Sequence, residues 1–173
     1  MSLRSLALVL LMAAPPALAQ EAETPMTLSR MADIVFALDE DARSAGPSFE
    51  MTIDDIPVLI VTDPEADRMR AMIPIRSADG LTEDELLRMM QANFDSALDA
   101  RYAVANGRLW AVFIHPFAAL ERDQFISGIA QTVNVAKSYG TLYSGGAAQF
   151  GGGDSGGLQR DLIERLLDRG QDI

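Results

Sequence analysis

Residues 101–115 read RYAVANGRLWAVFIH, and this stretch decides the fold because it predicts a β-hairpin with a fixed register. The two flanks, Arg101 to Ala105 and Arg108 to His115, are apolar and rich in residues that favour strands. Between them, Asn106-Gly107 tolerates the positive φ values of a type I′ turn. The turn therefore sets which residues of the two strands lie opposite each other.

The aromatic side chains of this hairpin are candidates for a binding surface. Because side chains alternate along a strand, Trp110 and Val112 share one face, whereas Phe113 and Ala111 share the other. One of these faces must be core. The second is either covered by a helix or left as a recognition surface, so Trp110 and Phe113 are the candidate partner-binding residues of the hairpin.

Three more strands are predicted upstream of the hairpin. Residues 49–54 (FEMTID) alternate between apolar and polar, which is typical of a strand with one wet face. Residues 56–61 (IPVLIV) form a continuous apolar run, typical of a more buried central strand. Residues 68–75 (RMRAMIPI) alternate again and place arginines on the outer face. With a turn at Asp54-Asp55, these strands form a meander.

Helices are predicted over residues 27–39, 82–98 and 120–138, each with apolar residues at helical spacing. In the second helix, Thr82 and Glu85 have the spacing of a capping box in front of an apolar run. One broad apolar face of that helix consists of Leu86, Met90, Phe94 and Ala97, with Leu87 and Leu98 beside them.

The resulting order, α-β-β-β-α-β-β-α, implies an α+β domain over residues 27–143, in which helices pack against an antiparallel sheet of about five strands. The chain has 173 residues. This length is enough for one domain with a real core and too short for two ordinary ones.

The N-terminus has the pattern of a cleaved secretory signal peptide over residues 1–19. Arg4 is followed by the apolar run Leu6 to Ala14, which is too short to span a bilayer, and by the small-x-small site Ala17-Leu18-Ala19. We therefore expect a periplasmic or secreted protein. Residues 20–26 are polar and are predicted to be disordered.

The C-terminus is predicted to be a tethered helix. Residues 144–157 include seven glycines, which indicates a flexible linker, and residues 158–173 have the pattern of a short amphipathic helix. Its apolar stripe consists of Leu158, Leu162 and Leu166, with Ile163 and Leu167 alongside. A helix this short is marginal alone in water, so it must dock on its own body, on a second copy or on a partner. Leu162 and Leu166 are therefore the second pair of candidate partner-binding residues.

Charge and cysteine content exclude several functions. The formal net charge is −11, and removal of Arg4 with the signal peptide makes it −12, which opposes binding to nucleic acid and to anionic lipid surfaces. The sequence has no cysteine, which rules out disulfides, thiol redox chemistry and thiolate metal sites. No pattern in the chain implies a cofactor.

A family resemblance rests on a series of packing and turn residues. The series consists of Asn93 on a helix, ARYAV (100–104), Asn106-Gly107, LWAVFI (109–114), His115-Pro116, KSYG (137–140) and YSG (143–145). In order and spacing, residues 26–145 resemble the YbjN family of bacterial sensory transduction regulators, which are similar in fold to the small type III secretion chaperones. The resemblance implies that chaperone-like members bind polypeptide segments and often pair into dimers, and it offers no catalytic residues.

Two motifs suggest catalysis but lack the necessary partners. The letters GDSGG (153–157) match those around the nucleophile of trypsin-like proteases, yet Ser155 lies in a glycine run and the only histidine, His115, ends a predicted strand. One imidazole without cysteines makes no transition-metal site unless carboxylates complete it. The consecutive acids Asp39-Glu40-Asp41 lack the alternate spacing of a calcium loop.

The sequence therefore predicts a non-enzymatic protein that binds a polypeptide partner, which is a protein or peptide segment or a second copy of itself, through a sheet face or edge. No nucleic acid and no stable membrane insertion after signal cleavage are expected. One alternative is an envelope structural or assembly factor that acts through its C-terminal helix. A second is a carboxylate-dependent hydrolase, which would need a pair of acids with perturbed pKa values in one pocket.

Overall fold

The computed structural model describes residues 23–95, 97–139 and 155–170. The helices are α1 (Leu28–Leu38), α2 (Glu83–Asp95), α3 (Arg122–Ser138) and α4 (Ser155–Gly170). The strands are β1 (Arg43–Ala45), β2 (Ser48–Ile53), β3 (Ile56–Asp63), β4 (Arg68–Ser77), β5 (Arg101–Ala105) and β6 (Arg108–His115). The described helices are too short or too polar to cross a membrane.

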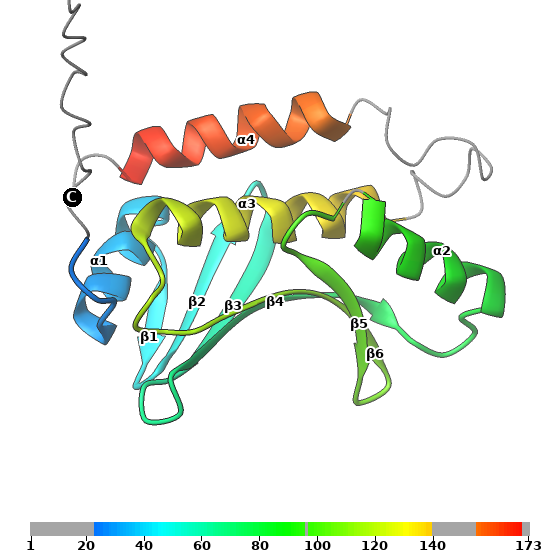
Figure 1. Cartoon of the computed structure of the whole chain (residues 1–173), viewed down its shortest axis with the longest axis horizontal. Helices are drawn as coiled ribbons and strands as arrows, with labels where there is room; N and C mark the ends of the chain where they lie inside the picture. The colour runs from blue at the N-terminus through cyan, green and yellow to red at the C-terminus, as the bar shows by residue number, and fades with distance from the viewer. Residues whose placement is uncertain (1–22, 96, 140–154, 171–173) are drawn as a thin grey trace, which may run out of the picture.

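The strands form one antiparallel sheet in the order β1-β2-β3-β4-β6-β5. Helices α1 and α3 lie on one face of this sheet, α4 lies on the far side of α3, and α2 lies beside β5 at one end (Figure 1). The α+β class predicted from the sequence is confirmed. The sheet has six strands rather than about five.

The additional strand is β1, which the sequence pattern did not reveal. It has three residues, and all of them are exposed, so no alternation of apolar and polar residues marks it. Ala45 pairs with Ser48 across a two-residue connection in which Gly46 has a φ of +60°. Gly46 and Pro47 form the turn of this hairpin.

Two predicted hairpin turns are confirmed by their backbone angles. Asp54 and Asp55 have φ values of 50° and 65°, and Asn106 and Gly107 have φ values of 50° and 68°. Positive φ at both central residues is what a type I′ turn requires, and its twist matches that of the flanking strands. Each turn therefore fixes the register of the hairpin around it.

Side-chain caps begin the three helices that the sequence predicted in the main domain. In α1, the Thr27 hydroxyl accepts a hydrogen bond from the Arg30 amide at 3.2 Å. In α2, the Glu85 amide donates to the Thr82 hydroxyl at 3.2 Å and the Thr82 amide donates to the Glu85 carboxylate at 2.8 Å, so the predicted capping box is confirmed. Helix α3 begins with a similar exchange between Glu121 and Gln124.

The core lies between the sheet and the α1–α3 layer. Alternate residues of β2, β3, β4 and β6 point into it, and α3 is buried on nearly all sides because the sheet covers one of its faces and α4 another. At the closest crossing, Gly128 of α3 lies against the ring of Phe113, where a Cβ atom would come within 2.5 Å of the ring. A glycine is required at this crossing.

The two tails differ in part from their predicted boundaries. Residues 20–26 were expected to be disordered, but Met26 is buried in the core and its amide donates a hydrogen bond to the carbonyl of Ala118. Met26, together with the contacts that Glu23 and Thr24 make with Arg30, orders this polar segment. Helix α4 begins at Ser155, inside the stretch predicted to be linker. The predicted signal peptide and residues 140–154 lie outside the described residues.

Candidate functional site

One face of the sheet is covered by helices and the other is not, and the side chains of β6 show which residues lie on each face. Leu109, Ala111 and Phe113 point toward α3 and are buried. The alternate side chains Trp110 and Val112 are half-buried, and Ile114 is 53% exposed. Of the two faces that the sequence left undecided, the one with Phe113 is therefore core. The one with Trp110 belongs to a face of the sheet that no described helix covers (Figure 1).

We call this uncovered side the open face, and strand register shows that an apolar band crosses it. Leu59 lies opposite Met72, and Met72 lies opposite Val112, so three strands contribute to one row. A neighbouring row contains Val61 and Ile114, and a third contains Pro74 and Trp110. Because strands in a sheet lie about 5 Å apart, these side chains form one surface, in which Arg70 separates Val61 from Ile114.

Arginines lie within the apolar band and beside it. Arg70 lies between Val61 and Ile114 in the register, Arg101 lies opposite Val112, and Arg68 lies opposite Asp63. Arg108 sits with its guanidinium carbon 6.0 Å from the centroid of the Trp110 ring, within reach of a cation–π contact. The Arg101 guanidinium donates to the carbonyls of Leu98 and Ala100, and Asp63 and Glu50 lie on the same face, so the positive charge of this face is partly offset.

A hollow of about 440 Å³ lies on the open face between β3, β4 and β6. Its walls include Val61, Met72 and Ile114, the two arginines Arg68 and Arg70, and Asp63, which lies opposite Arg68 in the register. The arrangement places apolar surface and cationic groups within one depression. A segment that combines apolar and acidic side chains would satisfy both.

The sequence signal for the open face was ambiguous. Residues 56–61 were predicted to form a more buried central strand. Strand β3 is indeed central, but its outward side chains lack a cover, and Val61 is 44% exposed. A continuous apolar run does not say which of its two faces meets a helix. The alternating arginines of β4 were the only indication that this side of the sheet meets water.

A second apolar surface lies on α2. The residues of this helix that point into the protein are Met89 and Ala92, which are buried. Ala97 of the broad apolar face predicted from the sequence is buried, but the rest of that face points toward solvent, with Phe94 92% exposed. We call this the α2 surface; its members are Leu86, Leu87, Met90 and Phe94, with Leu98 just beyond the helix.

Asn93 attaches α2 to the edge of the sheet. Its side-chain oxygen accepts a hydrogen bond from the Tyr102 amide at 2.7 Å, and its side-chain nitrogen donates to the Tyr102 carbonyl at 3.2 Å. The amide side chain therefore pairs with β5 as another strand would. This contact blocks strand addition at Tyr102.

The four predicted partner-binding residues fall in different places. Trp110 lies on the open face, and its indole nitrogen donates to the Ala105 carbonyl at 3.1 Å. Phe113 is in the core against α3, although its ring also lines a hollow of about 580 Å³ beside α4. Leu162 and Leu166 are buried where α4 packs on the main body. The structure thus does not bring the four together.

The residues considered for catalysis are placed apart from one another. The His115 ring stacks on Phe113 at a centroid distance of 5.9 Å, and its Nδ1 is 2.8 Å from the carbonyl oxygen of Pro116. Ser155 begins α4. In the part of the chain that the structure describes, histidine and acidic residues do not gather into a group of three that could hold a metal.

Three carboxyl groups have shifted pKa values, and each is held in its ionised form. A hydrogen bond from Lys137 and then one from Arg165 lower the pKa of Asp54. Hydrogen bonds from the Thr82 amide and hydroxyl lower the pKa of Glu85. Partial burial acts to raise the pKa of Glu23, but the Arg122 amide and the Arg30 guanidinium outweigh it, so the pKa is lowered.

These three carboxyl groups lie on different elements and do not line the hollows described above. The pKa values of these three groups are lowered, which is the opposite of what a general acid needs.

Comparison with solved structures identifies the architecture. The chain of the Yersinia pestis type III secretion chaperone SycH, solved in complex with a stable fragment of YscM2, is 17% identical in sequence, and the match covers 64% of this chain and 97% of that one with a TM-score of 0.50. A chain of the ExsC–ExsE complex matches at 17% identity over 66% of this chain and 94% of that one, with a TM-score of 0.48. The fold is that of a type III secretion chaperone.

Sequence comparisons add nothing to this assignment. No protein-family model matches the chain, and no curated protein matches it in sequence. At 17% identity, the likeness to SycH extends to the fold and not to the function.

Proposed function

We propose that the protein is a non-enzymatic polypeptide-binding protein and that the open face receives its partner. The observation that carries this proposal is the apolar band that crosses three central strands without a helix over it. Contiguous apolar surface of this kind marks interaction sites in soluble proteins. The SycH structure was solved with a bound protein fragment, which supports a protein partner for this fold.

The chemistry of the open face defines the partner. Arg70 lies within the apolar band, and Arg68 and Arg108 lie beside it, whereas Asp63 and Glu50 on the same face offset part of their charge. A segment with apolar residues, and with Asp or Glu at the positions that meet these arginines, is complementary. A segment with Lys or Arg at those positions meets like charge. Because these arginines are exposed, the electrostatic part of the binding should weaken as salt rises.

Two labelled peptides test the proposal. They share one set of leucines and isoleucines, and the residues between are glutamate in one peptide and lysine in the other. Fluorescence anisotropy should show that the glutamate peptide binds more tightly and that Ile114→Asp abolishes its binding. Val104→Asp is the matched control. Val104 is 52% exposed on the neighbouring strand, but it pairs with Leu109, whose side chain lies on the covered face of the sheet.

Equal binding of the two peptides, or equal loss of binding in the two variants, would contradict the open face as the site. In that case the apolar band would be surface without a binding role.

We also propose that the protein is of the YbjN type and acts in the periplasm or outside the cell. The support is the series of residues from Asn93 to Gly145 together with the signal-like pattern of residues 1–19. N-terminal sequencing of the protein from a periplasmic fraction should return Gln20 as the first residue. Recovery of Met1 or Ser2 would contradict export with cleavage.

A second candidate function is self-association through the α2 surface. Phe94 is 92% exposed, which is extreme for an aromatic side chain next to other apolar residues, and a second copy would cover it. A symmetric pair would bring the α2 surface of one copy onto the same surface of the other.

Sedimentation velocity tests this self-association. The wild-type chain should sediment as a dimer and Phe94→Asp as a monomer. Phe36→Asp, which alters a 41% exposed phenylalanine on α1, should leave the dimer intact. A wild-type monomer at high micromolar concentration would contradict the proposal and leave the peptide-binding function untouched.

A further inference from the structure

Helix α4 covers the side of α3 that faces away from the sheet. The buried residues Leu162, Leu166 and Gly170 repeat at a spacing of four and so form one stripe. Gly170 crosses closest, since a Cβ atom there would lie 2.5 Å from Cδ1 of Ile126. Ile126, Ala130 and Val133 of α3 are completely buried and share one helix face by the same spacing rule.

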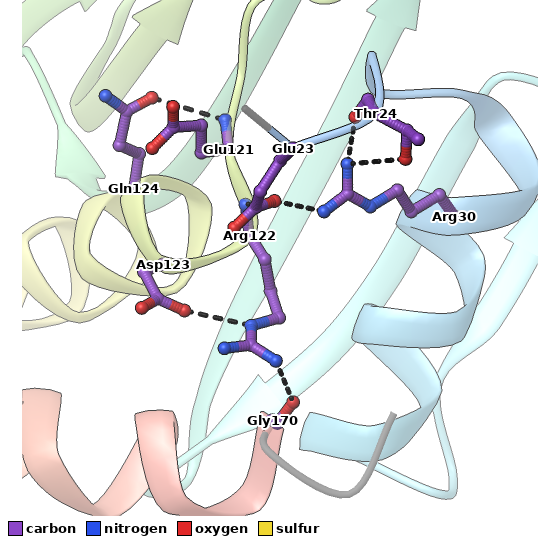
Figure 2. Close-up of polar contacts among 8 residues, drawn as sticks. All are labelled: Glu23, Thr24, Arg30, Glu121, Arg122, Asp123, Gln124 and Gly170. Carbon is purple, nitrogen blue, oxygen red and sulfur yellow. Dashed lines mark hydrogen bonds and ion pairs between the residues drawn. The ribbon is translucent and has the colours of Figure 1, made fainter. Parts of the chain in front are cut away.

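The polar contacts of α4 lie at its margins. Arg165 donates to the Asp54 carboxylate at 3.1 Å, beside the Lys137 ammonium at 2.8 Å, and the Arg165 side chain is 54% exposed. The other two contacts reach backbone carbonyls. Arg169 donates to that of Leu38 in α1, and Arg122 donates to that of Gly170 at 3.4 Å (Figure 2). Exposed ion pairs of this kind stabilise weakly, so leucine burial is the main attachment.

The N-terminal end of α3, where α4 finishes, is also tied to the start of the chain. Glu23 accepts a hydrogen bond from the Arg122 amide at 3.1 Å and pairs with Arg30 of α1 (Figure 2). Asp123 accepts from the Arg122 guanidinium at 2.9 Å. The contacts of Glu23 link the start of the chain and α1 to α3 and do not involve α4.

Helix α4 leaves part of its surroundings unfilled. A hollow of about 580 Å³ lies alongside it, lined by Ile163 and Leu167 of α4, by Phe113 and Ile114 of β6, and by polar residues of α3. A larger helix in the same position would bury more apolar surface than α4 does. The SycH match covers 97% of that chain with 64% of this one, so part of this chain lies outside the match.

We propose that the surface of α3 and α1 under α4, which we call the α4 seat, is a binding site for an amphipathic helix of a partner protein, and that α4 is its resident occupant. The sequence of α4 indicates which residues a partner helix needs in order to bind the α4 seat. Leucines stand at positions 162 and 166, an arginine at 165 faces Asp54, and a glycine at 170 permits close approach to Ile126. A partner helix should present the pattern Leu-x-x-Arg-Leu with a small residue four positions later.

We expect a partner helix to replace α4 on the α4 seat, rather than α4 to leave the seat empty. Departure of α4 without a substitute would expose Ile126 and the two leucines to water, which is unfavourable. A helix from outside restores that burial as it binds. Its apparent affinity equals the intrinsic affinity multiplied by the fraction of molecules in which α4 is undocked. The proposal rests on the proposed function only in assuming a polypeptide partner, since it concerns the opposite side of the sheet.

The probe is a labelled peptide with the sequence of residues 155–170, and the protein is the full mature chain. In the variant Leu162→Asp with Leu166→Asp, the resident helix is undocked and the α4 seat is intact. Fluorescence anisotropy should show peptide binding at least about tenfold tighter to this variant than to wild type. The matched control is Leu86→Asp with Met90→Asp, an exposed pair at the same spacing on α2, which should bind as wild type does.

A second double variant keeps the test decisive if circular dichroism shows that Leu162→Asp with Leu166→Asp has lost its fold. The chain has no cysteine, so Ile126→Cys with Gly170→Cys can form one disulfide only, between α3 and α4. The reduced protein should bind the peptide and the oxidised protein should not. Equal affinity in the two states, no binding to either, or formation of a dimer by exchange of α4 between copies would overturn the proposal. Binding of the acidic peptide to the open face should persist in all these variants, so the two proposals fail separately.

Discussion

Helices α2 and α4 are both amphipathic, yet they use their apolar stripes in opposite ways. Leu162 and Leu166 of α4 are buried against α3, whereas Phe94 and Met90 of α2 point into solvent. Helix α4 is held mainly by apolar burial, and α2 is held at its end by the pairing of Asn93 with Tyr102. The difference teaches that apolar residues at helical spacing predict a stripe and say nothing about what covers it.

The two helices should differ most in how much free energy of unfolding is lost when one apolar side chain is removed from each. Leu166→Ala should lower the free energy of unfolding by about 2–5 kcal/mol, because Leu166 is 1% exposed and its loss leaves a cavity. Phe94→Ala should change it by no more than about 0.5 kcal/mol in dilute solution. Urea denaturation measures both. Similar losses in the two variants would mean that α2 is covered in solution or that α4 is not docked.

Asn93 should have the next largest effect, through a hydrogen bond rather than through packing. Asn93→Ala leaves the Tyr102 amide without its partner, which should cost about 1–3 kcal/mol. Hydrogen exchange at the Tyr102 amide should also become faster. Gln91→Ala, on an exposed position of the same helix, is the control. If the two variants proved equally stable, the attachment of α2 would lie elsewhere.

The smallest expected effect concerns the ion pairs at the margin of α4. Hydrogen bonds from Lys137 and Arg165 lower the pKa of Asp54 below its usual 3.8, so they stabilise the fold above that pH, and the contribution is lost as pH falls through the folded pKa. Asp54→Asn should cost about 0.2–1 kcal/mol near pH 7 and nothing well below about pH 4.

Asp55→Asn controls for the turn, because both residues have positive φ and asparagine suits that conformation equally at each. If the difference in stability between Asp54→Asn and Asp55→Asn did not depend on pH, the Asp54 carboxylate would not contribute to the attachment of α4.

The sequence predicted those parts of the fold in which local chemistry is decisive. Asn106-Gly107 and Asp54-Asp55 require positive φ, and Thr82 with Glu85 caps a helix, so the hairpins and the start of α2 followed directly. Strand β1 was missed because its three exposed residues have no pattern. The ordered start at Met26 was missed because one buried residue in a polar segment is no signal.

The site was predicted less well, because it depends on tertiary cover. Trp110 and Phe113 were both candidates, and only the position of Gly128 under the Phe113 ring decides that this face is core. The open face combines residues from β3, β4 and β6, and no sequence spacing reveals that they are neighbours. Register and helix placement are long-range properties, which a single sequence leaves open.

Trp110 provides the most direct test of the central proposal, because it is the only tryptophan in the chain and it lies half-buried on the open face. Titration with the glutamate-containing apolar peptide should shift the Trp110 emission to shorter wavelength and saturate at the dissociation constant measured by anisotropy. The shift should be absent in Ile114→Asp and preserved in Val104→Asp. Peptide binding that leaves the Trp110 emission unchanged would contradict the account, because the partner would then lie on some other surface.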